Sequence, residues 1–310
     1  MRHLAPLALA LSLSAAAASA EVPDVVADTA VTYALVATVM GDLGTPTLLL
    51  DLGADAHDYQ LRPSQIRALN GAGLVIWLGP EMTPWLDQAI APDAKGNTLE
   101  LLHVPGTHLR AYEEADDDHE AEAEHVQAAD AGGHRHEGTD PHAWLDPDNA
   151  ALWLGQIADS LAQRDPGNAA VYRANASLAQ TAVHTMDEKI GVAMRVAKGK
   201  PLVVAHAAYG YFADHYGLTI AASIAEGDAA APGAAHLAEI EALLASGEVA
   251  CVFPEVLRDP KPVLALAEAA GVKVGGALDP EGRLIEPGAG FYGQLMTGLA
   301  GAIAACTATD

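Results

Sequence analysis

The chain has 310 residues, of which 51% are hydrophobic, enough to bury the cores of two domains of ordinary size. Its 41 acidic residues outnumber 16 lysines and arginines, so the formal net charge is −25. This charge argues against nucleic acid or an anionic membrane surface as a partner, and it is compatible with a cationic ligand.

The first twenty residues predict a cleaved secretory signal peptide. A positively charged start at 1–3 precedes an apolar core at 4–13, and Ala18-Ser19-Ala20 is a small-residue cleavage pattern. No later uncharged apolar run is long enough to cross a bilayer. We therefore expect an exported, periplasmic protein that begins near Glu21.

The chain has two cysteines, Cys251 and Cys306. In an oxidising compartment an even pair favours one disulfide. Two free buried thiols are the alternative.

Short apolar runs alternate with helical patterns from residue 25 to residue 104. Apolar strands separated by helices are typical of a parallel sheet covered on both faces, so we expect an α/β lobe over residues 21–167. The expected strands cover 25–27, 47–50, 74–78 and 98–104, and the expected helices cover 31–40, 63–70 and 82–90.

Residues 113–140 interrupt this lobe with the most polar run of the chain. The run contains eleven acidic residues and almost no large apolar side chains, so it cannot repay the entropy of ordering. We expect a mobile acidic loop. Its four histidines are His119, His125, His134 and His136.

A helix at 148–163 is followed by the longest helical pattern of the chain, at 168–198. Apolar residues recur there at helical spacing, and nothing within it demands a turn. We predict one spine helix, roughly 45 Å long at 1.5 Å per residue, which would link two lobes. Two helices with a break near Gly191 are the alternative.

A second α/β pattern fills residues 199–310. The overall prediction is thus an α/β protein with two Rossmann-like lobes of parallel-rich sheets joined by one spine helix. The expected strands of this lobe cover 201–205, 218–224, 249–254 and 272–277, and the helices cover 209–216, 235–245, 261–270 and 290–305.

Four potential metal ligands stand at strand or turn ends, where working residues gather in parallel α/β sheets. His57 follows the second strand, His142 lies between two Asp-Pro turns, His206 ends a strand and Asp279 follows the last expected strand. Two come from each lobe, so we predict a metal site in the cleft between the lobes. Three imidazoles and one carboxylate suit tetrahedral Zn²⁺ better than Mg²⁺ or Ca²⁺. Singly, each residue has a structural alternative: a loop histidine, a core histidine or a turn cap.

The segments around these residues resemble the zinc-binding solute-binding proteins of ABC transporters, the cluster A-I proteins of the ZnuA and AztC type. The likeness covers essentially the whole mature chain, in order. The AztC branch looks closest because the acidic loop is modest and is not a long polyhistidine run. The matching motifs are His57-Asp58-Tyr59, the segments 140–147 and 205–212, and Leu278-Asp279-Pro280.

The resemblance implies that His57, His142, His206 and Asp279 bind the metal. It also implies restricted hinge motion between the lobes and delivery of the captured zinc to a membrane permease. Manganese-binding relatives tend to carry a carboxylate at the position of His206, so the histidine favours zinc. For the loop at 113–140, the resemblance implies transient zinc capture or docking of a metallochaperone, and an acidic flap that only shields the cleft is the alternative.

We therefore expect a binding protein and not an enzyme. The first alternative is a zinc-dependent hydrolase with Asp279 as general base. The lack of an HExxH motif argues against it. The second is a periplasmic zinc buffer or surface adhesin with no permease partner, and a manganese-binding relative is the third.

Overall fold

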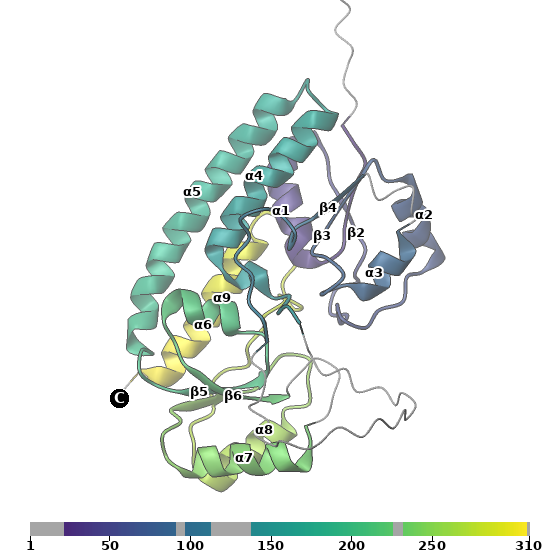
Figure 1. Ribbon diagram of the computed structural model, residues 1–310. Helices are drawn as coiled ribbons and strands as arrows, with labels where there is room; N and C mark the ends of the chain where they lie inside the picture. Colours follow the sequence, from purple (N-terminus) through teal and green to yellow (C-terminus); the bar gives the residue numbers. More distant parts are fainter. Residues whose placement is uncertain (1–21, 91–96, 113–137, 226–231, 309–310) are drawn as a thin grey trace, which may run out of the picture.

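The computed structural model describes residues 22–90, 97–112, 138–225 and 232–308. Two α/β lobes, each built on a parallel sheet, are connected by long helices (Figure 1). The predicted signal peptide at 1–20 lies outside the described residues. So does nearly all of the predicted acidic loop, including its four histidines.

The first lobe contains a four-stranded parallel sheet in the order β2-β1-β3-β4. Its central strands β1 and β3 are buried along their whole length, as their continuous apolar sequences predict. Its strands are β1 (Val25–Ala27), β2 (Thr47–Leu48), β3 (Leu74–Trp77) and β4 (Thr98–Glu100), and its helices are α1 (Ala30–Met40), α2 (Pro63–Gly71) and α3 (Pro84–Ala89).

The second lobe contains a three-stranded parallel sheet in the order β6-β5-β7. The strands are β5 (Leu202–His206), β6 (Ile220–Ala225) and β7 (Cys251–Phe253), and the helices are α6 (Gly210–Tyr216), α7 (Ala234–Ala245), α8 (Lys261–Ala270) and α9 (Phe291–Thr307). The predicted α/β class with two parallel sheets is thus confirmed.

Two long helices connect the lobes. A 3₁₀ turn, η3 (Ala143–Leu145), leads into α4 (Pro147–Arg164), which is capped by Asp146 accepting a hydrogen bond from the Asp148 N–H. The spine helix α5 (Ala169–Ala193) follows and ends in a second 3₁₀ turn, η4 (Met194–Val196). The prediction of a single helix is confirmed, since α5 passes Gly191 without a break.

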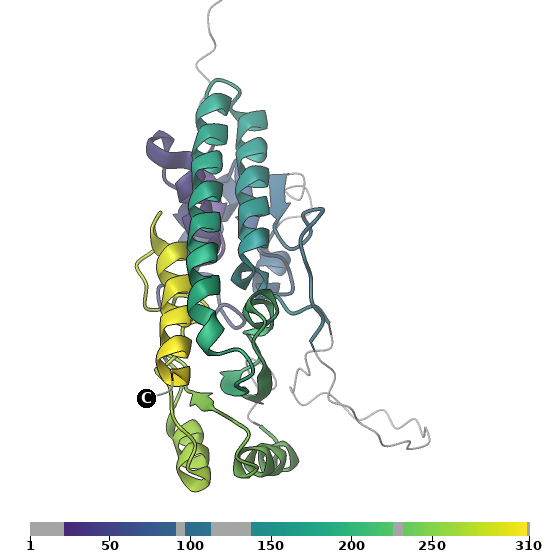
Figure 2. The same ribbon diagram turned by 90° about the vertical axis from the view of Figure 1, so that its left-hand side faces the viewer.

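One continuous hydrophobic core extends through both lobes. The spine helix α5 packs against α1 and α4, and also against the C-terminal helix α9. Figure 2 shows α4, α5 and α9 side by side. The same cluster of buried side chains includes Val25 of β1, Leu202 of β5 and Leu299 of α9. The two lobes therefore share one packed hydrophobic interior. The predicted domain boundaries stay a prediction.

The last expected strand, at 272–277, does not form as a strand. Val274 makes a single isolated parallel bridge to Val252. Two glycines, Gly275 and Gly276, follow, and a Cβ at Gly275 would lie 2.1 Å from the Phe253 ring. Glycine weakens strands, and here it is needed for a close approach to β7. The segment therefore runs beside β7 without a regular ladder.

A disulfide joins Cys251 of β7 to Cys306 of α9, with Cα atoms 6.3 Å apart. The predicted pairing is confirmed. None of the described helices is long and apolar enough to cross a membrane.

Candidate metal centre

His57, His142 and His206 lie together between the two lobes. His142 is central, because its ring centroid is 5.5 Å from that of His57 and 5.5 Å from that of His206. His142 precedes η3, His206 ends β5, and His57 lies in the loop after β2. His142 and His206 are fully buried, while His57 is half-buried.

The spacing of these rings is close to that of imidazoles around one zinc ion. Zn–N bonds of about 2.0–2.1 Å in a tetrahedron place ring centroids roughly 5 Å apart. Within this cluster of described residues, no three ligand atoms of His57, His142, His206 and the neighbouring carboxylates lie within 4.8 Å of one another. A bound metal would therefore draw the side chains slightly inwards.

Asp140 orients His142. Nδ1 of His142 donates to Oδ1 of Asp140 at 2.8 Å, and the His142 backbone N–H donates to the same oxygen at 3.0 Å. A hydrogen bond at Nδ1 makes Nε2 the nitrogen that carries the lone pair. Nε2 of His142 is buried and has no hydrogen-bond partner. The imidazole is thus prepared to bind a cation.

Glu255, just after β7, does the same for His206. Nδ1 of His206 donates to Oε2 of Glu255, which also accepts from the Tyr209 hydroxyl at 3.1 Å. Nε of Arg258 donates to the other oxygen, Oε1, at 2.8 Å. Burial alone would raise the pKa of Glu255, but His206 and Arg258 outweigh it and lower the pKa. The carboxylate therefore stays ionised and fixes the tautomer of His206.

Several contacts fix the loop that carries the third histidine, His57. The backbone N–H of His57 donates to Oδ1 of Asp55 at 3.0 Å, and the indole of Trp85 donates to the Ala56 carbonyl at 2.7 Å. Nη1 of Arg283, from the second lobe, lies 4.0 Å from Oδ2 of Asp55. These contacts hold the backbone of the His57 loop.

The loop after Leu278 supplies two carboxylates. Both oxygens of Asp279 accept backbone hydrogen bonds, from Arg283 at 2.8 Å and Leu284 at 3.0 Å. Glu281 is 7% exposed, and its Oε1 accepts no hydrogen bond. Burial and Asp55 raise the pKa of Glu281, against the opposing influence of the three histidines. Glu281 thus shares an electrostatic environment with the histidines.

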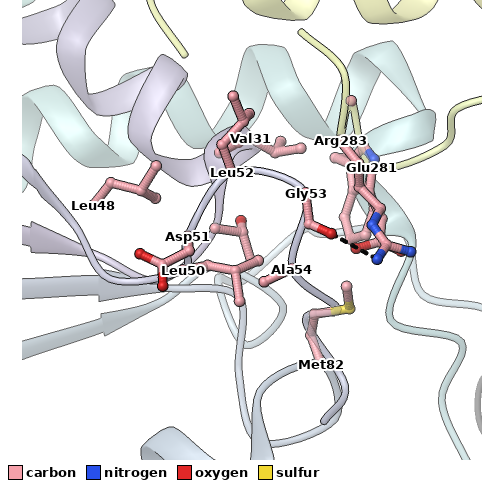
Figure 3. A pocket seen from close by; sticks show the side chains of 14 residues that line it. Val31, Leu48, Leu50, Asp51, Leu52, Gly53, Ala54, Met82, Glu281 and Arg283 are labelled. Atoms are coloured by element: carbon pink, nitrogen blue, oxygen red, sulfur yellow. Dashed lines mark hydrogen bonds between the residues drawn. The ribbon is translucent and has the colours of Figure 1, made fainter. Parts of the chain in front are cut away.

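A cavity lies at this junction and is lined by residues of both lobes (Figure 3). Apolar side chains from the first lobe, such as Leu50 and Met82, line one side, and Glu281 and Arg283 line the other. Figure 3 shows Glu281 and Arg283 side by side, with Nη2 of Arg283 donating to the Gly53 carbonyl at 2.8 Å. The loop at 278–284 therefore closes against the loop that carries His57.

A second polar cluster lies around Asp146. Its carboxylate accepts hydrogen bonds from His108 at 2.8 Å and His215 at 3.1 Å, and His215 also donates to Asp187 at 2.9 Å. These contacts raise the pKa of His215 to about 9, with Asp146 as the main cause. One ligand atom each from Asp146, Asp148 and His215 lie within 4.8 Å of one another. A protonated His215 makes this cluster an ion-pair network between α6 and the spine.

The comparison with known proteins decides the family. A family profile described as "Zinc-uptake complex component A periplasmic" (ZnuA) matches residues 25–306. The chain belongs to this family.

Relatives within the family match over nearly the whole length. The High-affinity zinc uptake system protein ZnuA of Paracoccus denitrificans (strain Pd 1222) is 46% identical, with 98% of each chain covered. The protein of the same name from Brucella abortus (strain 2308) is 31% identical, with 88% of each chain covered. Membership of the zinc-binding solute-binding proteins, predicted from the four motifs, is confirmed, whereas the closer likeness to AztC stays a prediction.

Solved structures of similar fold support the same architecture. The laminin-binding adhesin Lmb of Streptococcus agalactiae superposes with a TM-score of 0.76 at 21% identity, covering 92% of this chain and 100% of that one. A zinc-bound ZnuA carrying a 138–173 deletion superposes with a TM-score of 0.73 at 22% identity, covering 93% and 98%. At these identities the likeness establishes the fold.

Two features around the predicted ligands were not anticipated from the sequence. Glu255 is the buried partner of His206, and Glu281, not Asp279, carries the carboxylate oxygen without a hydrogen bond. Glu255 follows β7, which pairs with the strand that ends in His206, so its place at the same sheet edge was an available signal. Nothing in the local sequence separates the roles of the two loop carboxylates.

Proposed function

We propose that this protein captures Zn²⁺ in the periplasm and delivers it to the permease of an ABC transporter. The ZnuA relatives are named as zinc uptake proteins, and the family is one of periplasmic binding components. The observation that carries the proposal is the grouping of His57, His142 and His206 between the lobes. We assign these three imidazoles, together with a carboxylate for which Asp279 is the sequence candidate, as the zinc ligands.

The donor set favours zinc over harder cations. Imidazole nitrogens suit Zn²⁺, whereas Mn²⁺ and Ca²⁺ prefer sites richer in oxygen. Asp140 and Glu255 fix the tautomers of His142 and His206 before a metal arrives, which reduces the entropy cost of binding. This arrangement supports selective, tight capture of a scarce ion.

The arrangement also supports binding without catalysis. A hydrolytic zinc site keeps an open position for water and a general base close by. Asp279, the base of the hydrolase alternative, has both oxygens engaged by the Arg283 and Leu284 backbone. We infer a carrier of metal ions and not an enzyme. Docking of a metallochaperone by the 113–140 loop stays a prediction.

The test uses mature protein stripped with a chelator. We expect uptake of one tightly bound Zn²⁺ per chain, measured by elemental analysis and by competition with a fluorescent zinc indicator. His206→Ala and His57→Ala should each weaken zinc binding by more than about 100-fold, because a direct ligand counts for more than a partner that orients one. His184→Ala, an exposed position on α5, is the control. Failure of the parent to take up zinc, or a preference for Mn²⁺ in competition, would overturn the proposal.

Delivery is tested separately in cells. Deletion should impair growth in zinc-limited medium, with rescue by added zinc and by the wild-type gene but not by the His206→Ala variant. Normal growth of the deletion strain under zinc limitation, with no other importer present, would favour a buffer.

A further inference from the structure

The loop from Leu278 to Leu284 carries two carboxylates with opposite roles. Asp279 uses Oδ1 to accept the Arg283 N–H at 2.8 Å and Oδ2 to accept the Leu284 N–H at 3.0 Å. Two such bonds close the backbone of the loop into a turn, as aspartates commonly do. Asp279 therefore already has a structural function in the absence of a metal.

Glu281 has no such function. Its side chain is more than nine-tenths buried, and Oε1 is shielded from solvent without accepting a hydrogen bond from any described residue. Leaving a buried carboxylate oxygen unpaired is unfavourable. A cation bound at this position would supply the missing interaction.

The surroundings of Glu281 identify the cation site. The groups that interact with its charge are Asp55 and the three histidines, His57, His142 and His206. No other carboxylate oxygen among the described side chains of the 278–284 loop is both buried and without a hydrogen bond. The ring centroid of Trp144 lies 5.2 Å from that of His142, and its indole donates to the carbonyl of Pro280, the residue before Glu281, so this open carboxylate stands next to the histidine cluster.

The backbone on both sides of Glu281 is anchored. The carbonyl of Pro280 accepts a hydrogen bond from the buried indole of Trp144 at 2.8 Å. Gly282 adopts a left-handed φ of 71°, and a Cβ there would lie 2.2 Å from the Phe291 ring. Arg283 then reaches across to the Gly53 carbonyl. With the main chain fixed at residues 280, 282 and 283, the Glu281 side chain is held at the interface of the lobes.

We propose that Glu281, through Oε1, is the carboxylate that joins His57, His142 and His206 on the zinc ion, and that Asp279 is a positioning residue that shapes the loop. This inference rests on the proposed function and replaces Asp279 as the fourth ligand. Three imidazoles and one carboxylate give the four donors of a tetrahedral zinc site.

Two isosteric variants separate the roles. Glu281→Gln should weaken zinc binding by at least about 100-fold, since a direct ligand counts for more than a partner that orients one. Metal-free Glu281→Gln should melt no lower than the parent, because an unpaired buried charge is removed. Asp279→Asn should bind zinc within threefold of the parent but melt at a lower temperature. Zinc affinity is measured by indicator competition, and melting by circular dichroism with chelator present.

The Co²⁺-substituted protein gives a readout of coordination itself. Its visible d–d absorption should change in Glu281→Gln and be unchanged in Asp279→Asn. Glu281→Ala repeats the test should the glutamine amide bind the ion. Parent-like zinc affinity and Co²⁺ spectra in both Glu281 variants would overturn the inference, as would loss of binding in Asp279→Asn alone. If the parent binds zinc and His206→Ala does not, the proposed function stands whichever carboxylate proves to be the ligand.

Discussion

Nδ1 of His142 lies 2.8 Å from Oδ1 of Asp140, and both side chains are buried at the junction of the lobes. Asp140 stands two residues before the histidine, so one short segment supplies both a proposed zinc ligand and the group that orients it. The Tyr211 hydroxyl, from α6, donates to the Asp140 carbonyl at 2.8 Å. The second lobe therefore helps to hold the segment of the first lobe that carries His142.

Asp140→Asn is expected to weaken zinc binding by about 10- to 100-fold, the usual effect of removing a partner that orients a metal-binding histidine. The amide oxygen can still accept from the backbone N–H of His142, so the fold should be retained. Indicator competition measures the affinity. Asp159→Asn, at an exposed ion pair with Arg173 on α4 and α5, is the matched control. An unchanged affinity in Asp140→Asn would show that the tautomer of His142 is set in another way.

Gly282→Ala should destabilise the protein by about 3 kcal/mol and loosen the loop that holds Glu281. Left-handed backbone costs a residue with a Cβ roughly 1–2 kcal/mol, and the close Phe291 ring adds an overpacking cost of about 1–3 kcal/mol. Gly247 has a similar φ of 78° but nothing within 4 Å of a Cβ. Gly247→Ala should therefore cost only about 1 kcal/mol. Urea unfolding of the two variants measures the difference, and equal losses would contradict the packing argument.

His215 predicts a pH dependence of stability. Its pKa is raised from 6.5 to about 9 in the folded protein, so folding favours the protonated form. The contribution is fully present below pH 6.5 and is lost as the pH rises through 9. A shift of this size corresponds to at most about 3.4 kcal/mol. The free energy of unfolding, measured with chelator present at pH 6, 7.5 and 9, should fall more steeply in the parent than in His215→Gln.

His184→Gln controls for general effects of removing a histidine, because His184 is exposed on the same helix as Asp187. Its stability should depend on pH as the parent does. Identical pH profiles for the parent and His215→Gln would show that the ion pairs with Asp146 and Asp187 contribute nothing to folding.

The disulfide predicts a stability effect that is separate from metal binding. Replacing both Cys251 and Cys306 by alanine opens a loop of 55 residues, which corresponds to about 4 kcal/mol in the chain-entropy description. Denaturant unfolding of the double variant measures the loss. Zinc affinity should change less than threefold under folding conditions, because Cys251 pairs with Leu202, at the opposite end of β5 from His206. A large loss of affinity in a folded double variant would tie the disulfide to the site.

Much of the fold follows from local sequence. Apolar runs such as Leu74–Trp77 have the composition of strands buried on both faces, and uninterrupted helical spacing identifies α5. The segment at 272–277 also has an apolar, β-prone pattern, but its two glycines meet the Phe253 ring and a regular ladder does not form. Sequence propensity thus locates most helices and strands, whereas packing against β7 determines the structure of the segment at 272–277.

The site is only partly readable in the same way. His57, His142 and His206 stand at strand or turn ends, so the topology of parallel sheets predicts that they meet. Asp279 and Glu281 are two residues apart on one loop, and their roles depend on which of them caps the Arg283 and Leu284 N–H groups. That choice is made by backbone geometry around Pro280 and Gly282, which motif matching does not resolve.

The hydrophobic core that α1, α4, α5 and α9 share has a consequence for recognition by a transporter. Helices that pack into one interior resist wide separation of the two lobes. We therefore expect zinc binding to cause no large hinge movement between them. We expect the zinc-laden and empty forms to differ mainly in the short segments around residues 53–57 and 278–284. A permease that distinguishes the two forms would then recognise the conformation of those two segments.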